Sequence, residues 1–171
     1  MHLRRRTLLG TALAAPLLSA CATTGAGAAL APLPHDSSSY ARPDEARVRH
    51  VSLDLIADFE RKLFSGKAVL DIAARPDARE IVLDCDGLDI RAVRAGGRDA
   101  AYAIGEAVEG RGAPLTIQLD GARVIEIEYE SAPNARALQW LEPAQTASGK
   151  RFLFSQGQAI NNRTWIPTQD S

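Results

Sequence analysis

Val51 to Ala74 reads VSLDLIADFERKLFSGKAVLDIAA, a stretch in which two apolar runs flank a charged centre. In the first run, Val51 to Leu55, apolar and polar residues alternate at every position, a period typical of a β-strand with one buried face. The charged residues Glu60 to Lys62 then precede a second run, Ala68 to Ile72. Two such runs joined by a polar turn predict a long β-hairpin in this part of the chain.

Further short runs rich in β-branched and aliphatic residues follow this hairpin. They are Ile81 to Leu83, Leu88 to Val93, Leu115 to Leu119 and Val124 to Tyr129. Turn signals separate them: Asp86-Gly87, a tight turn at Gly96-Gly97, and Asp120-Gly121, which predicts a second hairpin. No run of helical period lies between these strands, and no internal repeat of fixed period is present. The sequence therefore predicts an all-β fold, an antiparallel β-sandwich.

The C-terminal stretch from Arg136 to Ser171 reads RALQWLEPAQTASGKRFLFSQGQAINNRTWIPTQDS and combines aromatic residues with side-chain amides. The aromatic residues are Trp140, Phe152, Phe154 and Trp165, and the amides are Gln156, Gln158, Asn161 and Asn162. Packed rings can hold amides in fixed positions, and an amide offers both donors and an acceptor, which suits a peptide backbone. The alternative is that these amides satisfy neighbouring backbone groups of the chain itself.

Two motifs in this stretch carry a family resemblance. The first is A-L-Q-W-L-x-P-x-Q-T at 137–146, and the second is F-L-F-S-Q-x-Q-A-I-x-x-R-x-x-x-P-x-Q-D at 152–170. Both closely resemble the N-terminal domain of the gluzincin zinc aminopeptidases, in particular the leukotriene A-four hydrolase branch. Val51 to Ala74, Ile81 to Ile90 and Tyr102 to Glu106 resemble the same domain in the same order, so the resemblance covers nearly all of the chain after Arg47.

The resemblance implies a substrate site. In the family, the Q-x-Q stretch lines the peptide groove beside the zinc domain, so the candidate substrate contacts are Gln156, Gly157, Gln158 and Ala159. Gln158 is the first choice, and the alternative is a structural amide that supports a domain interface. Four other matching positions look architectural: Arg163, Pro167, Gln169 and Asp170. The chain departs from the family at Gly157, where many relatives have Cys, and at Asn161, where this branch often has His.

The chain lacks the motifs that would perform the family's reaction. H-E-x-x-H, which places two zinc ligands one helical turn apart beside a general base, is absent, and so is G-x-M-E-N, which in the family recognises the free amino terminus. Asp84 and Asp86 are close in sequence, but a polar strand edge explains them more simply than acid and base catalysis. We therefore expect no catalytic residue, metal ligand or cofactor in this chain, with zinc belonging to a missing catalytic domain.

The N-terminus has the features of an export signal. Arg4 to Arg6 form a basic segment, and the apolar run Leu8 to Leu18 is too short to span a bilayer as a helix. Leu18 to Cys21 resembles a bacterial lipobox, and the preceding arginines also resemble a twin-arginine signal. We expect residues 1–20 to be a lipoprotein signal peptide and Cys21 to be lipidated. Residues 21–46, rich in Ala, Gly, Pro and Ser, are expected to form a flexible tether, and residues 47–171 the domain.

Composition limits the remaining possibilities. The full chain has 20 basic and 21 acidic residues; the expected signal peptide contains three arginines and no acid, which leaves 17 basic residues and a net charge of −4. This balance excludes a basic nucleic-acid surface. If Cys21 is lipidated, Cys85 is a single thiol without a partner for an internal disulfide, and its apolar neighbours favour a buried core position.

Three functions fit these observations. The first is the N-terminal substrate-anchoring domain of a membrane-tethered zinc aminopeptidase in a bacterial cell envelope, with the peptide N-terminus and the catalytic domain as partners. In this case the sandwich is incomplete at its C-terminus and the chain is inactive alone. The second is a truncated, non-catalytic lipoprotein that acts as a peptide-binding or structural module of the envelope. The third is an independent β-sandwich binding module, for which the sequence names no ligand. The residues do not distinguish among substrates, and they leave epoxide chemistry open.

Overall fold

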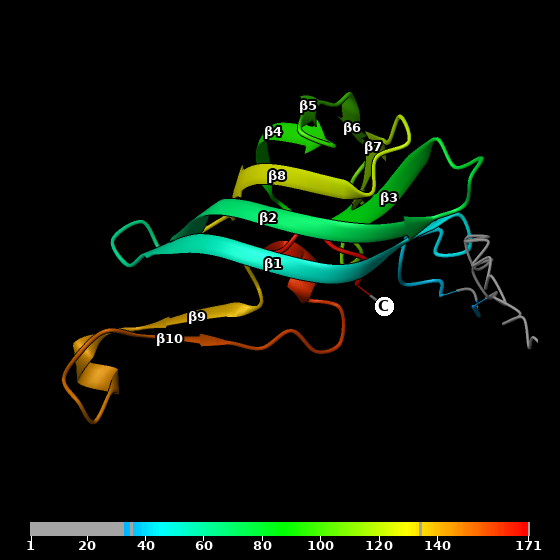
Figure 1. Cartoon of the computed structure of the whole chain (residues 1–171). Coiled ribbons are helices and arrows are strands. Elements are labelled where there is room, and N and C mark those ends of the chain that lie inside the picture. Colours follow the sequence, from blue (N-terminus) through cyan, green and yellow to red (C-terminus); the bar gives the residue numbers. More distant parts are fainter. Residues whose placement is uncertain (1–32, 35, 134, 171) are drawn as a thin grey trace, which may run out of the picture.

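The computed structural model describes residues 33–34, 36–133 and 135–170 of the chain. The expected signal peptide and Cys21 lie outside these residues. Almost all regular structure is β (Figure 1), which confirms the predicted fold class. The elements in order are β1 (Ala46–Asp58), β2 (Leu63–Ala74), β3 (Glu80–Cys85), β4 (Asp89–Ala95), β5 (Arg98–Asp99), β6 (Tyr102–Ile104), β7 (Ala113–Gln118), β8 (Val124–Glu130), β9 (Leu138–Leu141), the 3₁₀ turn η1 (Pro143–Gln145), β10 (Phe152–Ser155) and the 3₁₀ turn η2 (Asn162–Thr164).

β1 and β2 form the long hairpin that the sequence predicts. They pair antiparallel from Ala46 opposite Ala74 to Asp58 opposite Leu63, with one irregularity between Val48 and His50. β2 contains a glycine, Gly66, whose φ is 146°. A Cβ at this position would lie 2.2 Å from the backbone oxygen of Asp54 on β1, so the close approach of the two strands requires glycine here.

Two antiparallel sheets enclose the core. The larger sheet has the strand order β1-β2-β8-β4-β5, and the smaller has the order β3-β7-β6. In β7 every second residue is buried, and β8 shows the same alternation. These buried faces meet in one hydrophobic cluster that includes Leu70, Leu83, Leu115 and Ile127. Removal of this apolar surface from water is the main force that holds the two sheets together.

The predicted turn at Gly96-Gly97 is confirmed, because it joins β4 to β5 in an antiparallel pair. The predicted hairpin at Asp120-Gly121 is wrong. β7 lies in the smaller sheet and β8 in the larger one, so this exposed turn connects the two sheets. Both strands bury every second residue toward the same core. This alternation is the same for two consecutive strands that pair in one sheet and for two that face each other across the core, so it cannot distinguish the two arrangements.

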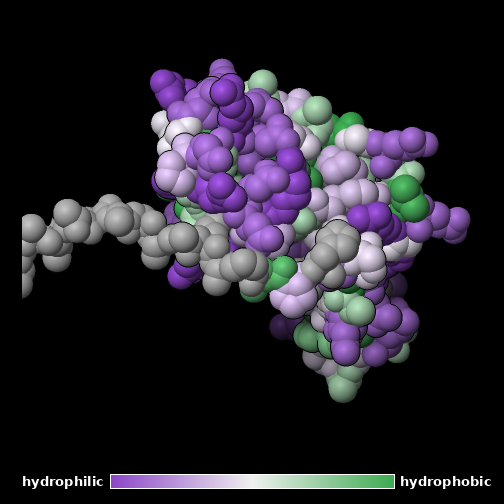
Figure 2. Space-filling model, turned by 90° about the vertical axis from the view of Figure 1, so that its right-hand side faces the viewer, coloured by the Kyte–Doolittle hydropathy of each residue, from purple (hydrophilic) through white to green (hydrophobic). Residues whose placement is uncertain are grey.

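β9 and β10 form a separate two-stranded hairpin, with Leu138 opposite Ser155 and Leu141 opposite Phe152. In Figure 1 this hairpin lies below β1 and β2. Figure 2 views the molecule from one end and shows a large, mostly hydrophilic upper body with a smaller lobe of mixed hydropathy projecting below it, at the level of this hairpin.

The described residues before β1 pack on the domain. The Ser39 hydroxyl is buried and donates to an Asp84 carboxylate oxygen over 2.6 Å, and the Tyr40 backbone N–H donates to the other oxygen over 2.7 Å. The Arg111 guanidinium lies 3.8 Å above the Tyr40 ring. The folded part of the chain therefore begins before Arg47, inside the segment expected to be a tether. Within the described residues, no helix has the length and apolar character needed to cross a membrane.

Candidate functional site

Gln156 to Ala159 lie in the loop that connects β10 to η2, which runs from Gln156 to Asn161, and hydrogen bonds fix both ends of this loop. The Gln156 N–H donates to the Ala137 carbonyl oxygen over 2.8 Å, and the Asn161 N–H donates to the Gly157 carbonyl oxygen over 2.8 Å. The Asn161 side-chain amide donates to the Gln158 carbonyl oxygen over 3.1 Å. The loop is thus held in one shape by the chain around it.

The four candidate residues differ in the hydrogen-bonding groups that they present to a ligand. Gln156 is exposed, but its side-chain oxygen accepts a hydrogen bond of 3.1 Å from the Gln158 N–H. Gln158 and Ala159 are also exposed, and the peptide bond between them is cis. Within the described residues no hydrogen bond engages the Gln158 side-chain amide, so its donors and its acceptor remain available to a ligand.

Gly157 leaves room for its neighbour Asn162. A Cβ at position 157 would lie 2.2 Å from the Asn162 side-chain oxygen, so a larger residue here requires that Asn162 move. The Asn162 amide lies 3.4 Å from an Asp170 carboxylate oxygen. Glycine at position 157 is therefore compatible with the local packing of this chain. Through Asn162 and Asp170, the candidate loop is linked to a buried polar network.

Arg163 is the centre of that buried network. Its side chain is fully buried, and its guanidinium donates to the Arg111 carbonyl oxygen over 2.7 Å and to the Ser38 carbonyl oxygen over 2.8 Å. The Asp170 carboxylate accepts from the Arg163 backbone N–H over 3.0 Å and lies 3.4 Å from its Nε. A buried cation needs such partners, and this arrangement fixes the chain directly after the candidate loop.

The other positions expected to be architectural also lie in contact with the sandwich. Pro167 is fully buried. The Gln169 side chain accepts from the Val48 N–H over 3.0 Å and donates to the Ala46 carbonyl oxygen over 2.9 Å, so it pairs with the start of β1 as a neighbouring strand would. The architectural interpretation of these positions is consistent with every one of these contacts.

Asp84 was expected to lie on a polar strand edge, and this expectation is wrong. Its side chain is fully buried, and it accepts hydrogen bonds from the Ser39 hydroxyl and from the Asp170 N–H over 3.0 Å. It also lies 3.7 Å from the Arg163 guanidinium. The reason is that β3 is buried on both faces and is also covered at its free edge. The Asp84 N–H donates to the Thr168 carbonyl oxygen over 2.7 Å, so the C-terminal segment runs beside this edge as a neighbouring strand would.

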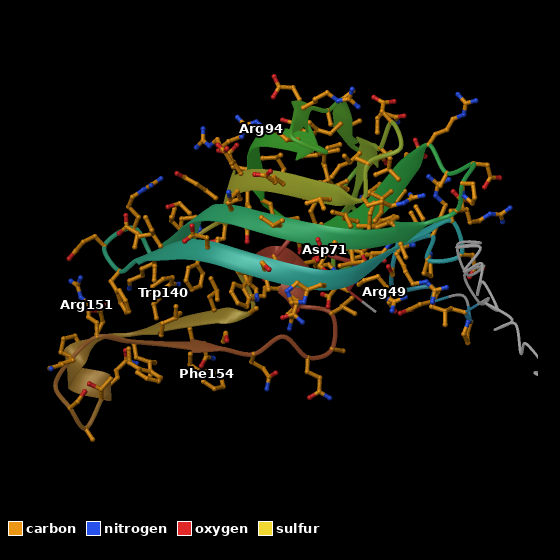
Figure 3. The ribbon with its side chains drawn as sticks, in the orientation of Figure 1. Arg49, Asp71, Arg94, Trp140, Arg151 and Phe154 are labelled. Carbon is orange, nitrogen blue, oxygen red and sulfur yellow. The ribbon has the colours of Figure 1, made fainter. Side chains whose placement is uncertain are left out.

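Only two of the four aromatic residues expected to support the amides are packed. Trp140 contacts Phe59 and Phe64, with ring centroids 5.2 Å and 5.9 Å apart, and Trp165 lies 5.3 Å from Phe64. Figure 3 shows Trp140 between the β9–β10 hairpin and the larger sheet, while Phe154 points away from that sheet. Phe152 and Phe154 are exposed, so they do not hold the amides in place.

Across 33–34, 36–133 and 135–170, no group of three or more His, Cys, Asp or Glu side chains is placed to hold a metal ion. Cys85 is buried as expected, and burial raises the pKa of its thiol to about 11.

An open hollow of about 670 Å³ lies between the segment before β1, the start of β1 and Thr168 to Gln169, and the candidate loop does not line it.

These observations define a class: an all-β domain that presents a fixed amide-bearing loop. The same fold occurs in an M1 zinc metallopeptidase of Deinococcus radiodurans, which aligns with 74% of this chain and 29% of its own at a TM-score of 0.53 and 18% identity. At that identity the likeness concerns the fold alone. No family model matches the chain.

More similar proteins identify the branch. Leucine aminopeptidase 2 of Phaeosphaeria nodorum is 39% identical over 146 residues, which are 81% of this chain and 23% of that protein. The structure of yeast LTA4 hydrolase in complex with Bestatin aligns with 81% of this chain and 23% of its own, at a TM-score of 0.75 and 29% identity. The chain thus spans about a quarter of the length of these relatives, and it is similar to the N-terminal part of leucine aminopeptidases and LTA4 hydrolases.

Proposed function

We propose that this chain is the substrate-anchoring part of a membrane-tethered zinc aminopeptidase, an enzyme that removes residues from the N-termini of peptides. The observation that carries the proposal is the Gln158 side chain, which is exposed and forms no hydrogen bond with the part of the chain that the structure describes, on a loop fixed at both ends. A peptide backbone offers one donor and one acceptor per residue, and a single amide can satisfy both.

Gln158 would bind the substrate backbone, and Gln156, Gly157 and Ala159 would shape its surroundings. Gln156 already uses its oxygen to fix the loop through the Gln158 N–H, so its contribution to substrate binding comes from its NH₂ group. Zinc and the water-activating glutamate would come from the catalytic domain, which lies in the part of the relatives that this chain does not span. On this proposal the chain alone has no aminopeptidase activity.

The test is a kinetic comparison in the native polypeptide of the source organism. Gln158→Ala should lower kcat/KM for a peptide substrate about three- to tenfold, the equivalent of one lost hydrogen bond. Gln118→Ala is the matched control, since it removes an amide on β7 that donates to Glu80 over 3.0 Å, remote from the loop. An unchanged kcat/KM for Gln158→Ala would assign Gln158 a purely structural role.

A second measurement separates the enzyme from a non-catalytic envelope module. The isolated chain should release no product from chromogenic aminoacyl substrates, with or without added zinc, while the native polypeptide should do so. Turnover by the isolated chain together with stoichiometric zinc binding would contradict the proposal that zinc and the catalytic residues belong to the catalytic domain. Tight peptide binding by the isolated chain, without activity in the native polypeptide, would favour the independent binding module.

A further inference from the structure

Residues 38–40, which precede β1, are bound to the sandwich through their backbone. We call these three residues the entry segment. Its first two carbonyl oxygens each accept a hydrogen bond of 2.8 Å, one from the Arg163 guanidinium and the other from the Arg111 guanidinium. These bonds fix the entry segment against two parts of the chain that are distant from it in sequence. The entry segment is therefore part of the folded domain.

The Ser39 hydroxyl joins the entry segment to a buried charge. The Ser39 side chain is buried, and its hydroxyl donates to the Asp84 carboxylate oxygen Oδ2 over 2.6 Å. The same oxygen accepts from the Asp170 N–H over 3.0 Å and lies 3.7 Å from the Arg163 guanidinium. A hydrogen bond to a charged acceptor is stronger than one between neutral groups. Ser39 thus shares one carboxylate oxygen with the two residues that fix the chain after the candidate loop.

From Asp170, side chains in direct contact lead to the candidate loop. An Asp170 carboxylate oxygen lies 3.4 Å from the Asn162 side-chain nitrogen. The Asn162 side chain in turn occupies the space beside Gly157, where a Cβ would lie 2.2 Å from the Asn162 oxygen. Gln158 follows Gly157 in the chain. A displacement of Asp170 therefore reaches the candidate loop through an unbroken series of contacts.

We propose that Ser39 is a positioning residue for the candidate substrate loop. Its hydroxyl fixes the Asp84 carboxylate, Asp84 fixes the Asp170 backbone, and this arrangement keeps Gln158 aligned. The inference rests on the proposed function and deepens it, because it assigns the alignment of the substrate loop to the segment through which the chain enters the domain. Without the hydroxyl, a buried carboxylate oxygen loses a donor, and the carboxylate is drawn toward the donors that remain.

Amide hydrogen exchange in the native polypeptide tests the proposal, because it measures the loop itself. In Ser39→Ala, residues 156–161 should exchange about tenfold faster, since a hydrogen bond to a charged group is lost. Residues 124–130, which form β8, should exchange at an unchanged rate. This comparison distinguishes a loosened loop from a destabilised domain.

Two control variants alter the entry segment without removing a donor to Asp84. Ser38→Ala makes the same chemical change at the preceding residue, whose hydroxyl forms no hydrogen bond with the part of the chain that the structure describes. Tyr40→Phe removes the hydrogen bond of 3.1 Å from the Tyr40 hydroxyl to the Gly112 carbonyl oxygen. Neither variant should change the exchange of residues 156–161.

Enzyme kinetics give a second readout. Ser39→Ala should raise KM for a peptide substrate about threefold and leave kcat within about twofold, because a misaligned backbone contact weakens the binding of substrate and transition state alike. An unchanged KM in Ser39→Ala, in a protein that Gln158→Ala impairs, would count against the positioning role even if the loop exchanges faster.

The remaining outcomes separate positioning from function. Unchanged exchange of residues 156–161 in Ser39→Ala, or equally faster exchange of β8, overturns the proposal and leaves Ser39 with a purely structural role. An equal effect of Ser38→Ala or Tyr40→Phe on the loop also overturns it. A faster loop with unchanged kinetics in both Ser39→Ala and Gln158→Ala supports the positioning role and contradicts the proposed function. A reduced kcat/KM in Gln158→Ala without a faster loop in Ser39→Ala does the reverse.

Discussion

At the scale of single residues, Arg163 connects three parts of the chain that are distant in sequence. Its guanidinium donates to the carbonyl oxygens of Ser38 and Arg111, and it is paired with Asp170 seven residues further on. Asp84 joins the same network from β3. Because the candidate loop ends only a few residues before Arg163, the position of Gln158 depends on this buried cation more than on any contact of its own side chain.

Replacement of Arg163 should therefore destabilise the whole domain. Arg163→Met leaves Asp84 and Asp170 buried without their cation, and we expect a loss of about 3–5 kcal/mol in the free energy of unfolding. Arg163→Lys should lose less but remain destabilised, since an ammonium cannot reproduce the planar fork of five donors. Urea denaturation of each variant provides the measurement.

Arg136→Met is the control for this series. Arg136 is exposed and makes a single ion pair with Asp86, with 2.6 Å between the charged atoms, so its removal should cost no more than about 1 kcal/mol. Equal stability of Arg163→Met and Arg136→Met would show that the buried network contributes nothing beyond a surface pair.

Sequence reasoning finds Arg163 and misjudges Asp84, and the difference has a physical cause. Arg163 stands in a motif whose neighbours already indicate a structural role. Asp84 stands close to Cys85 and Asp86 in a strand for which burial of one face is the usual expectation. Its burial depends on distant segments: Ser39 and Asp170 contact its carboxylate, and Thr168 pairs with its backbone at the edge of β3. A contact between residues more than 80 positions apart leaves no local pattern at Asp84.

At the scale of elements, the β9–β10 hairpin is fastened to the β1–β2 turn by ion pairs. Lys62 and Arg151 both contact Glu142, and Arg151 also contacts Glu60. The hydrogen bond from Lys62 holds the pKa of the Glu142 carboxyl below its ordinary value, with Arg151 adding to the effect. A carboxyl whose pKa is lowered by folding contributes stability above its unfolded pKa of about 4.3, and that contribution is lost as the pH falls through the lower folded value.

The attachment of the hairpin should therefore weaken in acid and in salt. We predict that Glu142→Gln loosens Trp140 at neutral pH, and that its difference from the unmodified chain disappears once the pH falls below the folded pKa of Glu142 or at about 1 M salt. Trp140 fluorescence in a Trp165→Phe background reports the change. A constant difference between the two chains at all values of pH and salt would contradict the electrostatic attachment.

The elements themselves were largely predictable, and their partners less so. The β1–β2 hairpin and the β4–β5 turn follow from local alternation and glycine turns, because the pairing strands are adjacent in sequence. The assignment of β7 and β8 to different sheets does not follow, since both show the same buried alternation. The sequence also predicts that the aromatic residues of β10 are packed. Their outward direction does not follow from the sequence, because it depends on which face of the β9–β10 hairpin Trp140 occupies against the larger sheet.

At the scale of the whole molecule, the N-terminal sequence predicts where the protein is located. Leu18 to Cys21 predicts cleavage before Cys21 and lipidation of its sulfur. Expression in a bacterial host should yield a form that fractionates with membranes and gains the mass of a lipid. Cys21→Ser should release the protein or leave the precursor uncleaved, while unchanged membrane retention and processing of this variant would contradict the lipoprotein assignment.

One side of the larger sheet ends in the long strand β1, and among the described residues the outer edge of this strand is paired at its start alone. β1 is the edge strand, and the Gln169 side chain pairs with Ala46 and Val48. From His50 to Asp58, no backbone hydrogen bond within the described residues engages the outer edge. Leu53, on the same face as the core-packed Val51 and Leu55, is 40% exposed. An unpaired edge with a wet apolar face favours pairing with another chain.

We therefore predict that residues 22–171, produced alone, self-associate through β1. Leu53→Lys should restore the monomer, since an inward-facing lysine opposes edge pairing, whereas Ser52→Lys places the same charge on the other face and should not.

A version lengthened by the segment that follows in the relatives should also be monomeric and should unfold at a higher temperature, by about 2–4 °C for each kcal/mol gained, because a further strand would cover Leu53. Sedimentation and thermal unfolding measure both effects. A short chain that is monomeric and as stable as the longer one would mean that the edge of β1 needs no partner.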